Sequence, residues 1–237
     1  EDLTEAIAYD IGKAYVTFTQ AKKVVIGRDC RPHSIPLQEA LTRGITEMGA
    51  DVVDIGECST PMNYFANGTL KAEGSIMITA SHNPAEWNGF KLCRAEAVPI
   101  SGVTGIEDIE AIVKAQAFKP VADTTGTVST YDILPEYREH IRPFMNFARR
   151  PKLAIDYANG MGIPEAKTFE DAVDQTRLFG DIDGAFPNHE ANPLHHATLA
   201  DLQKEVRSGS YDFGVAFDGD ADRAGFIDEK GDIIPMD

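Results

Sequence analysis

Two alternating patterns of apolar residues organise the first half of the chain. Short runs rich in β-branched residues predict strands at residues 23–27, 51–55 and 74–78. Segments in which apolar residues recur every three or four positions predict helices at residues 34–48 and 60–70. Strands that alternate with helices in this way are typical of a largely parallel sheet with helices on its faces.

The apolar run at residues 89–93 follows the third strand after a short loop. So short a connection favours antiparallel pairing, and we expect this run at one edge of the sheet. Further along, the patterns predict a helix at residues 104–114, a loop at 118–130, and a helix at 131–147 that Pro135 and Pro143 interrupt.

The strand and helix pattern restarts after Arg149-Arg150-Pro151, which reads as a joint between domains. We predict strands at residues 153–156 and 213–217, a glycine-rich turn at 159–162, a helix through 199–206 and a short strand at 224–227. The predicted fold class is therefore α/β, with two consecutive domains, residues 1–150 and 151–237, whose mixed, mainly parallel sheets are flanked by helices. The two halves are not evident repeats, and a duplicated unit stays an open alternative.

Composition indicates a globular protein, because 43% of the residues are hydrophobic and low-complexity tracts are few. No stretch approaches the ~20 apolar residues of a membrane span, and the first residues do not resemble a signal peptide. We therefore expect a cytoplasmic protein without a membrane partner. The three cysteines are far apart in the sequence, so we interpret them as reduced packing residues.

The formal net charge of −16 narrows the class of partner. It argues against nucleic-acid binding, which needs an excess of Lys and Arg on the binding face. It would also repel an anionic substrate, so a local cluster of cations or a metal must reverse the sign at any such site. The candidates for that reversal are Arg28, Arg31, Lys91, Arg94 and Arg223.

A serine lies on the tight loop Thr79-Ala80-Ser81-His82-Asn83-Pro84, directly after the third predicted strand. A hydroxyl held rigidly on such a loop suits phosphoryl or acyl transfer. Taken alone, Ser81 is better explained as a turn hydroxyl that caps its own loop. Acyl transfer by Ser81 and His82 is disfavoured, because adjacent side chains of an extended loop diverge and no Gly-x-Ser-x-Gly motif is present.

Three carboxylates, Asp218, Asp220 and Asp222, alternate along the loop between two predicted strands. Alternate residues of an extended segment point the same way, which suits a hard divalent cation, and Mg²⁺ is our first choice. An EF-hand calcium loop would also use Glu229, but it requires glycine where this chain has Arg223, and it requires flanking helices. A solvated acidic turn is the remaining alternative.

The presence of both the serine loop and the aspartate loop favours a catalytic role for Ser81 over a structural one. Together they would supply an oxygen that can be phosphorylated, a metal that neutralises phosphate charge, and cations that hold the transferring group.

These motifs resemble those of the α-D-phosphohexomutase superfamily, specifically its phosphomannomutase/phosphoglucomutase branch. Residues 78–84 with Asn88-Gly89-Phe90-Lys91-Leu92 resemble the phosphoserine loop of that family, and residues 217–223 resemble its magnesium loop. Supporting matches are Gly27-Arg28-Asp29-Cys30-Arg31, the segment 56–61, residues 183–189, and Asn192-Pro193.

The resemblance implies a role for each matching residue. Ser81 would carry the phosphate, and Mg²⁺ would be bound by Asp218, Asp220, Asp222 and an oxygen on Ser81. Lys91 and Arg223 would lie near the phosphoserine, and His82 or Lys91 would assist proton transfer. The residues that the resemblance suggests for phosphate or substrate binding are Arg28, Arg31 and Asn83.

The implied reaction interconverts hexose 6-phosphate and hexose 1-phosphate, with mannose phosphates as the preferred sugars. The small-molecule partner is a sugar phosphate, and hexose 1,6-bisphosphate serves as intermediate and activator. Two alternatives remain: a non-catalytic phosphosugar-binding or interaction module on the same scaffold, and a metal-dependent phosphatase in which water attacks the phosphoserine. No oligomeric state is predicted.

The chain also departs from the family pattern. Family members have four domains, and this sequence resembles the first two, without domains III and IV and without the opening Tyr-Asp-x-Arg-Gly segment. Residues 160–181 are shorter than the helix and strand expected there. We therefore expect the phosphoserine and metal half of a site, with Mg²⁺ binding but little or no mutase turnover by these residues alone.

Overall fold

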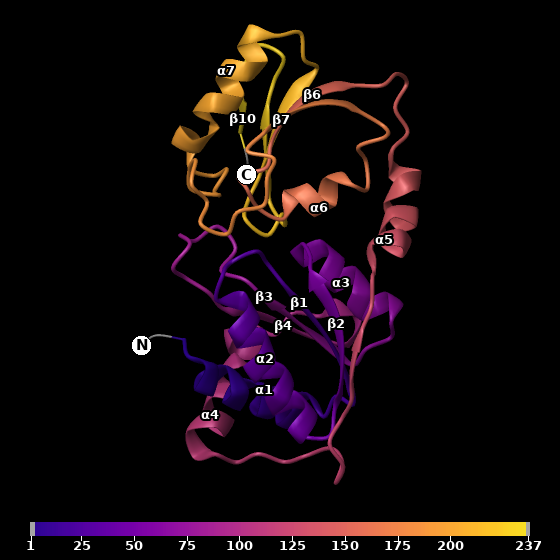
Figure 1. The fold of residues 1–237 in the computed structure, drawn as a ribbon, viewed down its shortest axis with the longest axis vertical. Coiled ribbons are helices and arrows are strands. Elements are labelled where there is room, and N and C mark those ends of the chain that lie inside the picture. The colour runs from indigo at the N-terminus through magenta and orange to yellow at the C-terminus, as the bar shows by residue number, and fades with distance from the viewer. Residues whose placement is uncertain (1–2, 236–237) are drawn as a thin grey trace. The chain divides into compact units, whose positions relative to one another are not determined.

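The computed structural model describes residues 3–235, which form two compact units of helices and strands (Figure 1). The first unit comprises the described residues up to Arg28 together with Pro32–Thr79 and Asn88–Ile133. The second comprises Asp29–Arg31, Ala80–Trp87 and the described residues from Leu134 onward. The loop that carries Ser81 is therefore part of the second unit, although it follows a strand of the first.

The first unit contains a five-stranded sheet in the order β4-β3-β1-β2-β5. Its strands are β1 (Lys23–Arg28), β2 (Asp51–Glu57), β3 (Gly74–Ile78), β4 (Phe90–Arg94) and β5 (Val128–Thr130). Strand β1 pairs in parallel with β2 and β3, and β5 pairs in parallel with β2. Strand β4 is antiparallel to β3 at the edge, as the short connection between them predicts.

Helices supply the apolar partners of this sheet. They are α1 (Glu5–Thr19), α2 (Ser34–Glu47), α3 (Thr60–Thr69) and α4 (Ile106–Ala115), with 3₁₀ turns at η1 (Ala95–Ala97) and η2 (Gly102–Thr104). Ile26 and Ile76 pack into one core with α1 and α2. Met77 faces the opposite side of the sheet, because side chains alternate along a strand, and its sulfur lies 3.9 Å from that of Cys58.

The second unit contains a five-stranded sheet in the order β10-β9-β8-β6-β7. Its strands are β6 (Lys152–Asp156), β7 (Asp174–Leu178), β8 (Phe213–Phe217), β9 (Ala224–Ile227) and β10 (Ile233–Ile234). Strand β6 is parallel to β7 and β8, whereas β9 is antiparallel to β8 and β10. The helices are α5 (Leu134–Ile141), α6 (Gly162–Ala166) and α7 (Ala200–Ser208), with 3₁₀ turns at η3 (Arg142–Phe144) and η4 (His196–Leu199).

Alternate residues of β6 supply two cores in the second unit. Ala154 packs with Leu202 and Val206 of α7, whereas Leu153 and Ile155 pack in a separate apolar cluster. Residues on both faces of β6 are therefore buried, as is typical of a central parallel strand.

Most of the predicted elements are confirmed, and β3 and β8 coincide with the predicted ranges. The loop predicted at residues 118–130 is wrong at its end, where β5 adds a short parallel strand. All three residues of β5 are exposed, so no burial pattern marks it. The helix predicted at residues 131–147 is shorter than expected, because α5 ends at Ile141 and a 3₁₀ turn containing Pro143 follows.

The predicted class, two α/β domains with mixed and mainly parallel sheets, is confirmed. The domain bounds 1–150 and 151–237 stay a prediction. Among residues 3–235, no helix is both long enough and apolar enough to cross a lipid bilayer.

Candidate functional site

Ser81 lies in a turn of the second unit with an uncommon backbone conformation. Its φ of 54° falls in the left-handed region, and the Asn83 amide donates to the Ala80 carbonyl at 3.0 Å to close the turn. For an L-residue other than glycine this conformation costs about 1 to 2 kcal/mol. Ser81 is also buried, with 7% of its surface exposed. Contacts with neighbouring groups must therefore hold the turn in place.

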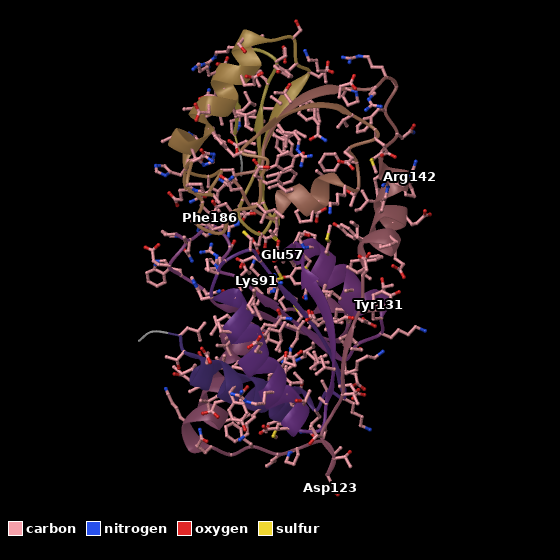
Figure 2. The ribbon with its side chains drawn as sticks, in the orientation of Figure 1. Glu57, Lys91, Asp123, Tyr131, Arg142 and Phe186 are labelled. Atoms are coloured by element: carbon pink, nitrogen blue, oxygen red, sulfur yellow. The ribbon has the colours of Figure 1, made fainter. Side chains whose placement is uncertain are left out.

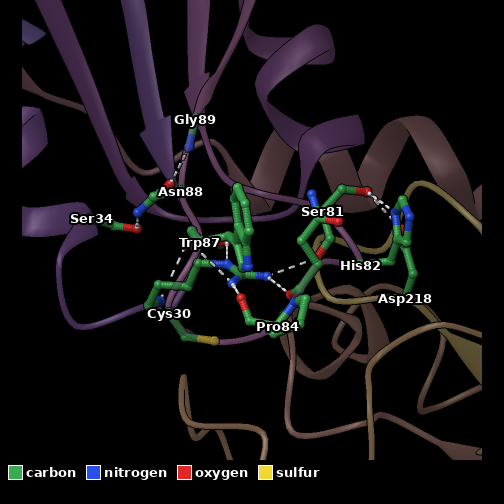
Figure 3. A network of polar contacts seen from close by, with 12 residues as sticks. Cys30, Ser34, Ser81, His82, Pro84, Trp87, Asn88, Gly89 and Asp218 are labelled. Carbon is green, nitrogen blue, oxygen red and sulfur yellow. Dashed lines mark hydrogen bonds and ion pairs between the residues drawn. The ribbon is translucent and has the colours of Figure 1, made fainter. Parts of the chain in front are cut away.

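Arg31 provides many of those contacts. Its Nη2 donates to the carbonyl of Ser81 at 3.0 Å and to that of Asn83 at 2.7 Å. Its Nη1 donates to the carbonyls of Pro84 and Trp87, the latter at 3.0 Å. Figure 3 shows these hydrogen bonds as dashed lines around Ser81, Pro84 and Trp87. The whole loop is thus tied to one guanidinium group.

The remaining surroundings of Arg31 complete its burial. Its Nε donates to Asp29 Oδ2 at 2.9 Å, and both side chains of this ion pair are fully buried. The ring of Phe186, labelled in Figure 2, lies with its centroid 5.0 Å from the guanidinium carbon. A side chain at Gly184 would collide with the Cys30 carbonyl, so glycine permits the close approach of that segment.

The hydroxyl of Ser81 lies among three ionisable side chains of the second unit. Ser81 Oγ donates to Asp218 Oδ2 at 3.0 Å and accepts from Arg223 Nη2 at 3.1 Å. His82 Nδ1 lies 3.5 Å from the same oxygen, at the limit of a hydrogen bond. Figure 3 shows Ser81 beside His82 and Asp218. A carboxylate, a guanidinium and an imidazole therefore surround one hydroxyl.

The acidic loop joins β8 to β9 and folds back on its first residue. The Asp218 amide donates to the Arg223 carbonyl at 3.1 Å, and the Arg223 amide donates to Asp218 Oδ1 at the same distance. One carboxylate oxygen from each of Asp218, Asp220 and Asp222 can be chosen so that all three lie within 4.8 Å of one another. Asp218 and Asp220 are buried and Asp222 is exposed, so the cluster opens on one side.

The charges of this cluster favour a bound cation. Burial raises the pKa of Asp218 to about 7, and the neighbouring Asp220 and Asp222 carboxylates add to the shift. Three carboxylates at this spacing repel one another, and a divalent cation offsets that repulsion. The ligand atoms are all hard oxygens, as Mg²⁺ prefers. The residues present therefore fit a magnesium ion.

Arg223 and His82 complete the electrostatics around Ser81. Arg223 Nε lies 3.7 Å from both Asp218 Oδ2 and Asp222 Oδ1, and its side chain is 35% exposed. Burial, followed by the Arg223 charge, lowers the pKa of His82, although Glu190, Asp220 and Asp222 oppose the shift. The imidazole is therefore neutral at pH 7, and a cation remains next to the serine.

Most of the predicted site residues belong to the second unit: Arg31, Ser81, His82, Asn83, Asp218, Asp220, Asp222 and Arg223. Arg28 and Lys91 belong to the first unit, where Arg28 pairs with Glu57 at 3.0 Å and Lys91 lies on β4 (Figure 2). Their predicted roles near the phosphoserine or the substrate stay predictions.

Two residues of this arrangement were given no role in the sequence analysis. Asp29 binds Arg31, and its signals were its place in the matching segment 27–31 and its position two residues before an arginine. Gly219 approaches the Ser81 carbonyl so closely that a Cβ would lie 2.4 Å from its oxygen. Glycine between two aspartates is also common in turns, so its spacing alone could not reveal this contact.

Comparison with known proteins agrees with these motifs. Residues 1–120 match the family described as phosphoglucomutase/phosphomannomutase, alpha/beta/alpha domain I, and residues 135–231 match its domain II. A phosphomannomutase of Escherichia coli is 40% identical over 99% of this chain and 54% of its own length. A phosphoglucomutase of Neisseria meningitidis serogroup A is 38% identical over 99% of this chain and 52% of its own.

A solved structure shows the same fold. A phosphoglucomutase/phosphomannomutase family protein from Burkholderia thailandensis has a TM-score of 0.90 and 33% identity, over 98% of this chain and 52% of its own. The chain thus spans about half the length of the curated relatives it matches. Both domain matches and these relatives agree, and the chain belongs to the phosphoglucomutase/phosphomannomutase family.

Proposed function

We propose that the protein interconverts hexose 6-phosphate and hexose 1-phosphate through a phosphoserine at Ser81. The observation that carries the proposal is the position of the Ser81 hydroxyl, 3.0 Å from Asp218 Oδ2 and 3.1 Å from Arg223 Nη2. An isolated turn hydroxyl has no need of a buried acidic cluster and a guanidinium at hydrogen-bond distance. A phosphoryl carrier needs both, because a cation and a metal site must balance the phosphate charge.

Asp218, Asp220 and Asp222 would hold Mg²⁺, which would supply charge neutralisation for the transferring phosphoryl group. Arg223 contributes a second positive charge at hydrogen-bond distance from the Ser81 hydroxyl, and its exposed fraction leaves room for a ligand. Mg²⁺ and Arg223 would together bring positive charge to the site. Without them, the net charge of −16 would repel a sugar phosphate.

The reaction begins when Ser81 Oγ attacks one phosphorus atom of hexose 1,6-bisphosphate. The Oγ–P bond forms as the sugar O–P bond breaks, and the departing sugar oxygen keeps the electron pair and finally takes up the proton that Ser81 releases. The hydroxyl, which donates to Asp218 Oδ2 in this structure, would turn its proton to His82 Nδ1 for this step, because the neutral imidazole can accept it when Nε2 carries the ring hydrogen. The phosphoserine then returns its phosphoryl group to the other position of a hexose monophosphate.

Mannose phosphates are the proposed preferred substrates. The segment Asn88-Gly89-Phe90-Lys91-Leu92 supports this choice, because it resembles the phosphomannomutase branch of the family. The Escherichia coli relative is also named a phosphomannomutase. The Neisseria meningitidis relative is named a phosphoglucomutase, so glucose phosphates belong in the same assay.

Intact-mass spectrometry of the full-length gene product tests the proposal. Incubation with Mg²⁺ and labelled hexose 1,6-bisphosphate should add about 80 Da, the mass of one phosphoryl group. Ser81→Ala should abolish the addition, because it removes the attacking oxygen. Ser208→Ala is the matched control, since Ser208 is exposed on α7 of the same unit and donates only locally, to the Glu205 carbonyl.

The products separate the competing functions. A mutase releases hexose monophosphate without free phosphate, and isomerises added hexose 6-phosphate. Free phosphate in excess of isomerisation would instead identify a phosphatase. No mass addition in a folded protein, with sugar phosphate still bound, would identify a non-catalytic binding module.

A further inference from the structure

We propose that Arg31 is a positioning residue, which fixes the serine loop so that the Ser81 hydroxyl stays aligned for phosphoryl transfer. The proposal rests on the proposed function of Ser81. Arg31 donates five side-chain hydrogen bonds, one to Asp29 and four to the carbonyls of Ser81, Asn83, Pro84 and Trp87. A guanidinium has five N–H donors, so each of them is used.

The chemistry of these contacts requires arginine. Burying a charge is costly unless it is paired and hydrogen-bonded, and Arg31 meets both conditions through Asp29 and the loop carbonyls. A lysine carries the same charge but only three donors, without the planar fork that reaches four carbonyls at once. A fully buried cation therefore serves mainly to bind a single loop of eight residues, Ala80–Trp87.

The contacts act on the Ser81 peptide itself. Arg31 Nη2 binds the Ser81 carbonyl, and the same oxygen lies against the backbone of Gly219 in the acidic loop. Ser81 keeps its left-handed φ of 54° between these two contacts, and its Oγ points to Asp218. Without Arg31 the residue would relax toward an ordinary φ, and its hydroxyl would move away from Asp218 and Arg223.

The burial of Arg31 also separates its role from that of Arg223. No side-chain N–H of Arg31 remains for a substrate phosphate, and its side chain is fully buried. Arg223 is one-third exposed and donates to Ser81 Oγ directly. We therefore assign Arg31 to the loop in place of the phosphate contact that the family resemblance suggests, and leave contact with the transferring group to Arg223.

A single tryptophan makes the loop observable. Trp87 is the only tryptophan of the chain, its carbonyl accepts from Arg31, and its side chain is 59% exposed. We would compare wild type with Arg31→Lys and Arg31→Gln by time-resolved fluorescence anisotropy. The anisotropy would be recorded on the 237-residue chain, in which Trp87 is the sole tryptophan. The rate of phosphoryl uptake by Ser81 would be measured on full-length gene product with the same substitutions, in the presence of Mg²⁺ and hexose 1,6-bisphosphate.

Arg150→Lys is the matched control. Arg150 also donates to two carbonyls, those of Asp171 and Val173, and pairs with an aspartate, Asp174, within the second unit. It does not contact the serine loop in the described residues. Its loss should therefore leave both the Trp87 anisotropy and the rate of uptake unchanged.

We expect Arg31→Gln to lower the maximal rate of uptake roughly 100-fold, since about 1 Å of misplacement has that effect. KM for the bisphosphate should change little, fast local motion of Trp87 should increase, and Arg31→Lys should fall between Gln and wild type. Circular dichroism checks that each variant is folded.

Other outcomes overturn the positioning role. Unchanged rate and anisotropy in folded variants would show that the loop holds without Arg31. A raised KM at unchanged maximal rate would make Arg31 a substrate contact. Unfolding of both variants would assign Arg31 to the stability of the second unit. Failure of the wild type to take up phosphate would contradict the function of Ser81, while the anisotropy alone would still report on the loop.

Discussion

At the scale of single residues, the site depends on a serine whose backbone conformation is fixed by its neighbours. Ser81 is buried, has a left-handed backbone conformation and contacts Asp218 and Arg223. All of these residues belong to the second unit. The sequence indicated a chemical role for Ser81 only in combination with the alternating aspartates and the family resemblance, because its own loop also suits a turn hydroxyl. The contact between Gly219 and Ser81 joins residues far apart in the chain, and no local pattern encodes it.

Gly219→Ala tests how closely the two loops must approach. A Cβ there would lie 2.4 Å from the Ser81 carbonyl oxygen, which is backbone and cannot turn away. We expect a loss of about 1 to 3 kcal/mol in the free energy of unfolding, typical of overpacking, and slower phosphoryl uptake at Ser81. Chemical denaturation and the mass assay measure the two effects.

Gly68→Ala is the control for this substitution. Gly68 lies inside α3. Apart from the helix's own backbone, none of the described residues has an atom within 4 Å of the point that an alanine methyl group would occupy. Alanine should therefore stabilise the helix by about 0.4 to 1 kcal/mol. If Gly219→Ala behaved like Gly68→Ala, the close approach of the two loops would have no energetic consequence.

At the scale of elements, the strands with continuous apolar runs could be predicted, and the polar ones could not. Strands β3 and β8 are short apolar runs between turns, and both were predicted with their observed bounds. Strand β7 reads Asp-Gln-Thr-Arg-Leu and lies at a sheet edge, so it has no apolar pattern. Helix α1 was not predicted either; its Thr4 cap is a weak signal, and its apolar face became evident only from packing.

The pair formed by His189 and Asp156 links the end of β6 to the loop before α7. His189 Nε2 lies 3.0 Å from the buried Asp156 Oδ2, and Nδ1 lies 2.7 Å from the Glu190 carbonyl. Burial lowers the pKa of His189, but the hydrogen bond and charge of Asp156 outweigh it, so the pKa is raised overall. Protonated His189 therefore stabilises the folded unit.

The sign of the pH dependence follows from that raised pKa. The stabilisation is fully present below the unfolded pKa of about 6.5 and is lost as the pH rises through the folded value. We expect a higher free energy of unfolding at pH 6 than at pH 8, and His189→Gln should remove this contribution. The exposed His140 provides a control, since His140→Gln should leave the difference in place. Asp218, whose pKa burial raises to about 7, contributes in the same direction, so part of the difference remains in His189→Gln. A difference as large as that of the wild type would contradict the assignment.

At the scale of the whole molecule, the chain carries two family domains and spans about half the length of its relatives. The loop that carries Ser81 and the acidic loop both belong to its second unit, so the proposed carrier and metal residues lie together in one compact body. The sequence predicted both loops, but it did not reveal that Ala80–Trp87 joins the second unit, because such an exchange depends on tertiary contacts.

Because the chain holds the proposed metal ligands but spans only half the length of its relatives, we expect Mg²⁺ binding and catalytic turnover to differ. The 237-residue chain should bind Mg²⁺, and Asp220→Asn should weaken that binding because it removes one of three clustered charges. The same chain should show little or no conversion of mannose 6-phosphate in a coupled assay. Isothermal titration measures the first result, and full isomerisation by these residues alone would contradict the second.

The most direct test of the central claim is to locate the transferred phosphoryl group by tandem mass spectrometry. The full-length gene product would be incubated with Mg²⁺ and isotopically labelled hexose 1,6-bisphosphate, then digested and sequenced. We predict that the label lies on Ser81. Isomerisation that proceeds while Ser81 stays unlabelled, or with the label on another residue, would contradict the account.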